Sequence, residues 1–422
     1  MNKFFYKILV SLNMGFFLAL RDIRRSNIWT TVLISFVMTL TFLNLVVVRG
    51  VLVGLTQGSV DANKFRYSSN IFLTELRDKD YIEDSTQIVK YLESLPQVDS
   101  ISARYLSSGK IESGYKTKIG PNDIPNFAVG QVAGIDPDKE NAVTGLSQYV
   151  INGQYLNDTD DDKVLVGSSL LFKYTAVEQA GSSPLKDADV GDKIRLTVGN
   201  KTIEVTIKGV LKGKISSIDN RIIMMDRQLR QMIGRSDLNA SEISIKIAPG
   251  SDEDYVKSLI LNQGFDRFAV IQTSTEALPK FVKDIATTFS LLGDLIGSIG
   301  LAVATITIFI VIFVNAITRR KYIGILKGIG INATAIEISY VFQALFYAIT
   351  GIGVGMLIVF LLIKPYFDAN PINFPFSDGI LVASMKDVLQ RAALLMASTA
   401  IAGYLPARII VKQNTLDAIL GR

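Results

Sequence analysis

Four long runs of apolar residues interrupt this chain. Residues 26–48, 295–318 and 338–363 carry no charged side chain, and a weaker run at 388–405 contains only Arg391, near one end. A helix of roughly 20 apolar residues crosses a bilayer, and an arginine near a helix end extends its side chain to the headgroups. The pattern therefore predicts four transmembrane helices. Their limits are residues 26–50, 285–318 with an outer stalk, 336–363 and 388–405.

The first 25 residues combine basic side chains with apolar positions at helical spacing. Phe5, Leu9, Leu12, Phe16 and Leu20 recur about every three or four residues, and no small-residue cleavage site follows them. This pattern predicts an amphipathic helix over residues 1–25 that lies in the membrane interface. The alternative is a frayed cytoplasmic tail.

Basic residues flank the apolar runs unevenly. Five precede the first run, four lie between the second and third, and three follow the fourth, whereas the loop at 364–387 and the start of the fourth run hold only three. Cytoplasmic loops carry the excess of lysine and arginine. We therefore expect a multi-pass protein of the cell (inner) membrane with both termini in the cytoplasm. Residues 57–284 and 364–387 are expected outside the cytoplasm, and 406–422 form a cytoplasmic tail.

The large outer segment shows an α+β pattern. A predicted helix at 82–95 lies between strands at 71–73 and 98–103, and a second at 252–263 lies between strands at 243–247 and 268–271. These two βαβ units predict one small sheet built from both ends of the segment. The insert between them, about residues 127–239, is strand-rich, with a hairpin centred on Gly199-Asn200.

The predicted helix from Thr275 runs through Pro279 into the second apolar run, because proline is tolerated in a first helical turn. The acidic stretch 157–163 lacks the glycine and glutamate of a calcium loop, which favours a solvated turn over a metal site.

Composition limits the chemistry. The 422 residues are 49% hydrophobic and 20% charged, with no cysteine and no histidine. Thiol nucleophiles, histidine bases and zinc sites built from Cys and His are therefore excluded, and we predict neither catalytic nor metal-binding residues. The net charge of +5 lies largely beside the apolar runs, so membrane topology explains it better than nucleic-acid binding.

Several short motifs then resemble one family, in an order that spans nearly the whole chain. They are Leu-Ala-Leu-Arg-Asp-Ile-Arg-Arg at 18–25, Arg-Arg-Lys-Tyr-Ile-Gly-Ile-Leu-Lys-Gly-Ile-Gly at 319–330, Leu-Pro-Ala-Arg at 405–408, Leu-Asp-Ala-Ile at 416–419, and Val-Gly-Asp-Lys-Ile at 190–194 with 205–209. Together with the four-span layout, they resemble permeases of the MacB, FtsX and lipoprotein-releasing (Lol) superfamily of ABC transporters. Tyr322 departs from that family, which often has glutamate there.

The resemblance implies a dimer with a second permease copy or homologue and two cytoplasmic ABC ATPase subunits. No Gly-x-x-x-x-Gly-Lys-Ser/Thr phosphate loop occurs in this chain, so ATP and Mg are expected in the partner and no cofactor in this subunit. Membrane lipids and an extracytoplasmic accessory protein are the other expected partners.

The segment 319–335 is similar to the family's coupling helix. The residues assigned to ATPase coupling are Arg319, Arg320, Lys321, Ile323, Gly324, Ile325, Leu326, Lys327, Gly328 and Gly330. Ile323, Ile325, Leu326 and Ile329 are interpreted as one apolar face that docks in a groove of the ATPase.

Two pairs of glycines have the small-xxx-small spacing of closely packed helices. Gly293 and Gly297, and Gly351 and Gly355, either line the dimer seam or pack within one subunit. Asp294, at the outer end of the second run, is interpreted as a hydrated acid rather than a proton relay.

The sequence supports two hypotheses for the function of this chain. The first is a permease subunit that exports or extracts an amphipathic substrate such as a lipoprotein, lipid, peptide or drug. The alternative is an FtsX-like signal transducer that activates an extracytoplasmic cell-wall hydrolase. In neither function is this chain an enzyme.

Overall fold

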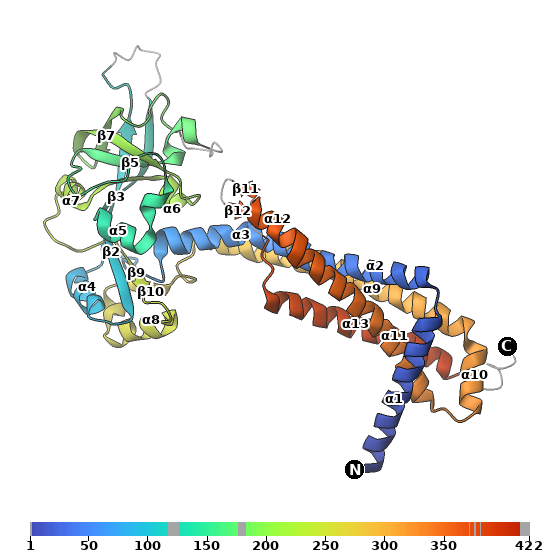
Figure 1. Cartoon of the computed structure of the whole chain (residues 1–422). Coiled ribbons are helices and arrows are strands. Elements are labelled where there is room, and N and C mark those ends of the chain that lie inside the picture. Colours follow the sequence, from blue (N-terminus) through green and yellow to red (C-terminus); the bar gives the residue numbers. More distant parts are fainter. Residues whose placement is uncertain are drawn as a thin grey trace. The chain divides into compact units, whose positions relative to one another are not determined.

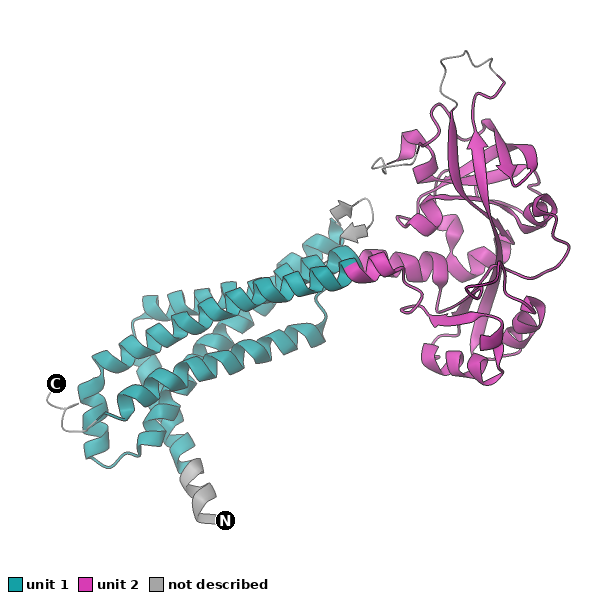
Figure 2. Ribbon diagram, turned by 180° about the vertical axis from the view of Figure 1, so that it is seen from behind, with its two compact units in different colours: residues 1–56, 285–372, 379–422 teal, residues 57–284, 373–378 magenta. Residues whose placement is uncertain are grey.

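The computed structural model describes residues 2–116, 126–175, 183–370, 372–374, 377–379 and 381–413, with the side chains of 2–9, 372–374 and 377–379 left out. It contains two compact units (Figure 2). One comprises residues 1–56, 285–372 and 379–422, and the other residues 57–284 and 373–378. We call them the helical unit and the outer domain and describe each by itself.

Four long helices and several shorter ones make up the described part of the helical unit (Figure 1). They are α1 Asn2–Arg25, α2 Ile28–Leu43, α9 Lys280–Thr318, α10 Arg320–Gly328, α11 Ala333–Ile358, α12 Lys364–Ala369 and α13 Met385–Val411. π-Helical turns at Asn44–Val48 and Val359–Ile363 join α2 to α3 (Arg49–Asn63) and α11 to α12, and a short strand pair, β11 Ile372–Phe374 and β12 Ser377–Gly379, follows α12.

Among the described residues, four helical stretches are long and apolar enough to cross a membrane. They are Ile28–Ser68, Lys280–Thr318, Ala333–Ala369 and Met385–Val411. The four predicted apolar helices are therefore confirmed. Their facing sides form one core that includes Met38, Phe42, Ile308 and Leu395, all fully buried.

The ends of these helices differ from the predicted limits. The first helix continues without a break past residue 50, since no proline interrupts residues 51–68. The second begins at Lys280 rather than Thr275, directly after Pro279, whose carbonyl accepts the N–H groups of Val282 and Lys283. The fourth runs six residues beyond Leu405, because Pro406 lies inside the helix without ending it.

The outer domain begins with a four-stranded antiparallel layer. Its strands are β1 Ile71–Thr74, β2 Val98–Glu112, β9 Glu242–Ile247 and β10 Val270–Thr273, in the order β10-β1-β9-β2, with helices α4 Ser85–Glu93 and α8 Glu253–Asn262. Strand β9 lies between β1 and β2, and β1 lies between β9 and β10. This is the split βαβ order of a ferredoxin-like fold, and the predicted sheet from both ends of the segment is confirmed.

Some boundaries in this layer were predicted wrongly. The first helix starts at Ser85 instead of residue 82, because the Ile82 N–H donates to the carbonyl of Ala240, 2.8 Å away. The last strand starts two residues late, after a 3-10 turn at Phe265–Arg267.

The remaining strands form a closed barrel, which the sequence did not predict. They are β3 Phe127–Ile135, β5 Lys163–Gly167, β6 Lys193–Val198, β7 Lys201–Leu211 and β8 Arg221–Met225, with β4 Val150–Gly153 paired to the end of β7. The C-terminal half of β2 closes the ring β2-β3-β8-β5-β7-β6-β2. The helices are α5 Pro137–Thr144, α6 Ser216–Asp219 and α7 Asp226–Ile233. The predicted hairpin at Gly199-Asn200 joins β6 to β7.

Candidate coupling segment and its supports

The predicted coupling segment folds as a short helix followed by a tight turn. Helix α10 ends in a Schellman motif, in which the Ile331 N–H donates to Leu326 and the Gly330 N–H to Lys327, both at 3.0 Å. Gly330 has φ +95°, a conformation that favours glycine. Asn332 then caps α11 by accepting the Thr334 N–H at 3.2 Å. The turn therefore fixes where α10 ends.

The apolar residues of α10 divide into two stripes. Ile323 and Leu326 are 3% and 8% exposed and belong to the core of the helical unit. Ile325 and Ile329 are 52% and 72% exposed, and Tyr322 lies three residues before Ile325 on the same side of the helix. The expectation of a single docking face that includes Ile323 and Leu326 is therefore wrong: these two hold α10 in place, and the exposed stripe is Tyr322, Ile325 and Ile329.

The basic residues of the segment also differ in their surroundings. Arg319 donates from Nη1 to Asp22 Oδ1 at 2.6 Å, which ties the start of α10 to the last turn of α1. Lys327 Nζ donates to the carbonyls of Val411 and Gln413 at 3.0 and 2.9 Å, at the end of α13 where helical carbonyls lack partners. Lys321 is exposed and Arg320 half-buried.

Helix α1 packs along α11. The Phe16 and Phe342 rings meet edge to face with centroids 5.6 Å apart, and a Cβ on Gly15 would lie 2.7 Å from Ile338. Burial raises the pKa of Asp22, although Arg319 lowers it. The predicted helix is present over Asn2–Arg25, and Leu12, Phe16 and Leu20 stay 40–56% exposed. Its location in the membrane interface stays a prediction.

The predicted glycine pairs pack against the first long helix. A Cβ on Gly351 would lie 2.4 Å from Met38 Cβ, and one on Gly355 would lie 2.4 Å from the Phe42 ring. On α9, a Cβ on Gly293 would meet Arg49 at 3.0 Å, and one on Gly297 would meet Leu45 at 3.3 Å. All four glycines therefore pack within one subunit. Of the remaining segment glycines, Gly324 is buried and Gly328 faces open space.

A buried cluster of charges joins three parts of the outer domain. Arg104 on β2 donates to Glu140 on α5 from Nε and Nη2, both at 2.8 Å, and to the carbonyl of Tyr67 at 2.7 Å. Arg221 on β8 pairs with Glu242 on β9 at 3.0 Å. Tyr67, in the π-helical turn Lys64–Ser68, donates its hydroxyl to Glu242.

The charges in this cluster balance. Burial would raise the pKa of Glu140, but Arg104 and the hydroxyls of Ser102 and Thr144 hold that pKa below its usual range. The patterns in the sequence did not predict this cluster. The available signal was weak, because Arg104 lies in a strand with many polar residues, and Arg221 and Glu242 each begin a strand.

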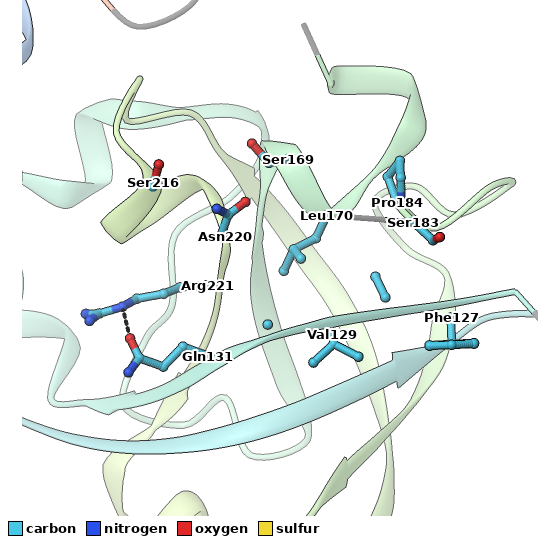
Figure 3. A pocket seen from close by; sticks show the side chains of 12 residues that line it. Phe127, Val129, Gln131, Ser169, Leu170, Ser183, Pro184, Ser216, Asn220 and Arg221 are labelled. Atoms are coloured by element: carbon cyan, nitrogen blue, oxygen red, sulfur yellow. Dashed lines mark hydrogen bonds between the residues drawn. The ribbon is translucent and has the colours of Figure 1, made fainter. Parts of the chain in front are cut away.

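A recess opens beside the first half of β3 (Figure 3). Phe127, Val129 and Gln131 form one wall, and Leu170, Pro184 and Asn220 lie across from them. Arg221, at its inner end, donates from Nε to Gln131 at 2.8 Å. The recess offers apolar and amide groups for binding. Its described lining contains no acid–base or nucleophilic pair.

The acidic stretch 157–163 is a charged turn. Asp160 is 3% exposed and pairs with Lys163 at 2.7 Å and with Lys208. These contacts lower the pKa of Asp160 to about 2, although burial opposes the shift. Within the described residues, no cluster of acidic side chains is arranged to hold a metal ion.

Asp219 makes the outer domain sensitive to pH. Burial raises its pKa to about 6, although it accepts the Gly213 N–H at 2.6 Å. Because this carboxyl ionises first in the unfolded chain, stability falls as pH rises from about 4 to about 6, by up to about 3 kcal/mol. We expect Asp219→Asn to remove this loss, so that the stability of the variant relative to the wild type increases as pH rises.

Hydrogen exchange of outer-domain peptides in the full chain, corrected for intrinsic rates, measures this difference. Asp158→Asn is the matched control, because Asp158 is exposed. If the Asp219→Asn and wild-type domains lost protection in parallel between pH 4 and 6, the assignment to Asp219 would be wrong.

Comparison with known proteins shows what this chain is similar to. Residues 295–415 match the family described as FtsX-like permease C-terminal. An uncharacterized ABC transporter permease of Methanocaldococcus jannaschii is 25% identical over 301 residues, covering 68% of this chain and 69% of the relative. A second such permease from that organism is 28% identical over 174 residues, covering 40% of this chain and 45% of the relative. The periplasmic region of MacB from Actinobacillus actinomycetemcomitans aligns with TM-score 0.35 and 14% identity, over 49% of this chain and 90% of that structure.

The matched region contains α10, α11, all of α13 and the part of α9 from residue 295 onward. Among its described residues, the molecule has four helices that are long and apolar enough to cross a membrane. It carries an FtsX-like permease domain and is similar over most of its length to an ABC transporter permease, which confirms the recognition made from the motifs.

Proposed function

We propose that this chain is the permease subunit of an ABC transporter, and that α10 receives motion from a separate cytoplasmic ATPase. The exposed stripe Tyr322, Ile325 and Ile329 supports this docking role, because α10 is fixed from behind by Ile323 and Leu326. A helix held on one side and apolar on the other suits a helix-in-groove contact. Movement of a docked α10 would reach the ends of α1 and α13 through Asp22 and Lys327.

The proposed assembly follows from the resemblance and the charge pattern. Two ATPase subunits hold ATP and Mg, and a second permease copy or homologue completes a dimer in the cell membrane. Both termini and α10 lie in the cytoplasm, as the basic flanks favour. The outer domain lies on the other side, where it acts on an amphipathic cargo such as a lipoprotein, lipid, peptide or drug.

Aspartate in place of Ile325 tests the docking role. Burying an isoleucine contributes roughly 1.5–3 kcal/mol, and a carboxylate in an apolar contact adds a further cost. Since 1.4 kcal/mol is tenfold in affinity, Ile325→Asp should weaken ATPase binding at least tenfold. The tagged variant is purified from membranes, and the retained ATPase and its ATP turnover are measured.

Two variants control this experiment. Ile325→Leu keeps an apolar side chain and should retain the ATPase. Leu326→Asp places a carboxylate in the subunit's own core, so it should lower the yield of the permease itself. Full ATPase retention and normal turnover in Ile325→Asp would refute docking through this stripe.

A further inference from the structure

Two arginines share one carboxylate in the helical unit. Arg391 Nη2 on α13 and Arg49 Nε on α3 lie 2.8 and 3.2 Å from the same oxygen, Oδ1 of Asp294 on α9. Among the described residues, no second carboxylate lies in ion-pairing distance of either guanidinium. Asp387, one turn before Arg391, instead accepts the Ser384 hydroxyl at 2.5 Å. The group therefore has a net charge of +1.

A cavity extends from this triad along the helices. Its polar end is formed by Asp294, Ser298, Gln390 and Arg391, and its apolar residues are Leu45, Leu301 and Leu394. Leu301 lies seven residues after Asp294 on α9, and Leu394 three residues after Arg391 on α13, so both helices pass from polar to apolar in chain direction. Leu394 belongs to a helix long enough to cross a membrane, and it is 44% exposed, so its side chain is accessible from the cavity.

We propose that this cavity binds an anionic glycerophospholipid, with the phosphate at Arg391 and an acyl chain along Leu301 and Leu394. Charged side chains in membrane helices pair with one another or mark a binding site, and arginine recognises phosphate groups through charge-assisted, often bidentate hydrogen bonds. One acid cannot neutralise two guanidinium groups, so an anion fits the remaining charge. A free phosphate would leave the apolar end empty, whereas a lipid fills both ends.

This lipid site requires α9 and α13 to lie in a bilayer but does not require ATPase coupling. Failure of lipid binding and failure of docking at Ile325 can therefore be told apart.

Native mass spectrometry of the full chain in detergent tests the proposal. The probes are phosphatidylglycerol and phosphatidylcholine with identical acyl chains. We expect the wild type to retain phosphatidylglycerol about tenfold more tightly than phosphatidylcholine, which is about 1.4 kcal/mol. Arg391→Gln should abolish this preference, and Arg391→Lys should keep most of it. Arg408→Gln, an exposed position on the same helix, is the matched control and should change nothing.

Asp294→Asn separates a lipid site from a structural ion triad. It raises the net charge of the group to +2, so phosphatidylglycerol should be held at least as tightly as by the wild type. If the triad only joined helices, Asp294→Asn and Arg391→Gln would both disrupt it, and both variants would retain less phosphatidylglycerol than the wild type. That result would overturn the proposal, as would equal retention of the two lipids or displacement of phosphatidylglycerol by millimolar inorganic phosphate.

Discussion

Arg104→Ala should destabilise the outer domain by about 3–5 kcal/mol, because it leaves the Glu140 carboxylate buried and unpaired. Glu140 is 2% exposed and would keep only the Ser102 and Thr144 hydroxyls as side-chain partners. Domains of this kind are stable by about 5–15 kcal/mol. The expected loss is thus a large part of the domain's free energy of unfolding.

Hydrogen exchange and limited proteolysis of the outer domain in the full chain measure this effect. Arg227→Ala is the matched control, since Arg227 forms an exposed pair with Asp161 at 2.9 Å and should cost less than about 1 kcal/mol. The double variant Arg104→Met, Glu140→Gln removes both charges and should recover most of the loss. If the double variant were as unstable as Arg104→Ala, lost packing would be the cause and the unpaired charge would not.

The loss of stability in Arg104→Ala should depend on pH. Without Arg104, burial raises the pKa of Glu140, and protonation removes the unpaired charge. The gap between wild type and Arg104→Ala should therefore narrow as pH falls toward 5. A gap that is constant between pH 5 and 8 would contradict this account.

Local patterns in the sequence predicted the elements but not all of their partners. Alternation at Ile243, Ile245 and Ile247 located β9, and these residues are buried as that pattern requires. The barrel closure was not predictable in the same way. It depends on the single long strand β2, whose first half pairs with β9 and whose second half pairs with β3 and β6. No local signal marks where such a strand changes partners.

Local sequence patterns likewise could not predict which face of the coupling segment is buried. Helical spacing identified four isoleucine and leucine residues, but α10 is short and contacts the core on one side only. Whether Leu326 or Ile325 faces that core depends on the rotation of α10, which the Arg319–Asp22 pair and the Gly330 turn help to fix. The partners of the glycines likewise lie far away in sequence: Gly351 meets Met38.

Gly351→Leu should separate α11 from α2 and lower the melting temperature of the helical unit. A Cβ at Gly351 would lie 2.4 Å from Met38 Cβ and 2.9 Å from both the Met38 carbonyl carbon and the Thr39 nitrogen. Backbone atoms cannot move aside as a side-chain end can, so the helices themselves must shift. Overpacking costs about 1–3 kcal/mol, which corresponds to roughly 2–12 °C for a unit of this size.

Gly353→Leu is the matched control, because a Cβ there meets nothing within 4 Å among the described residues. Both variants are heated in detergent, and the remaining monodisperse protein is measured together with its oligomeric state. We expect Gly351→Leu to melt earlier in whatever oligomeric state the wild type has, and Gly353→Leu to melt with the wild type. If Gly351 lined a dimer seam instead, Gly351→Leu would yield monomers that melt no earlier than wild-type monomers. That outcome would show that the close contact of α11 with α2 tolerates a side chain and does not hold the subunit together.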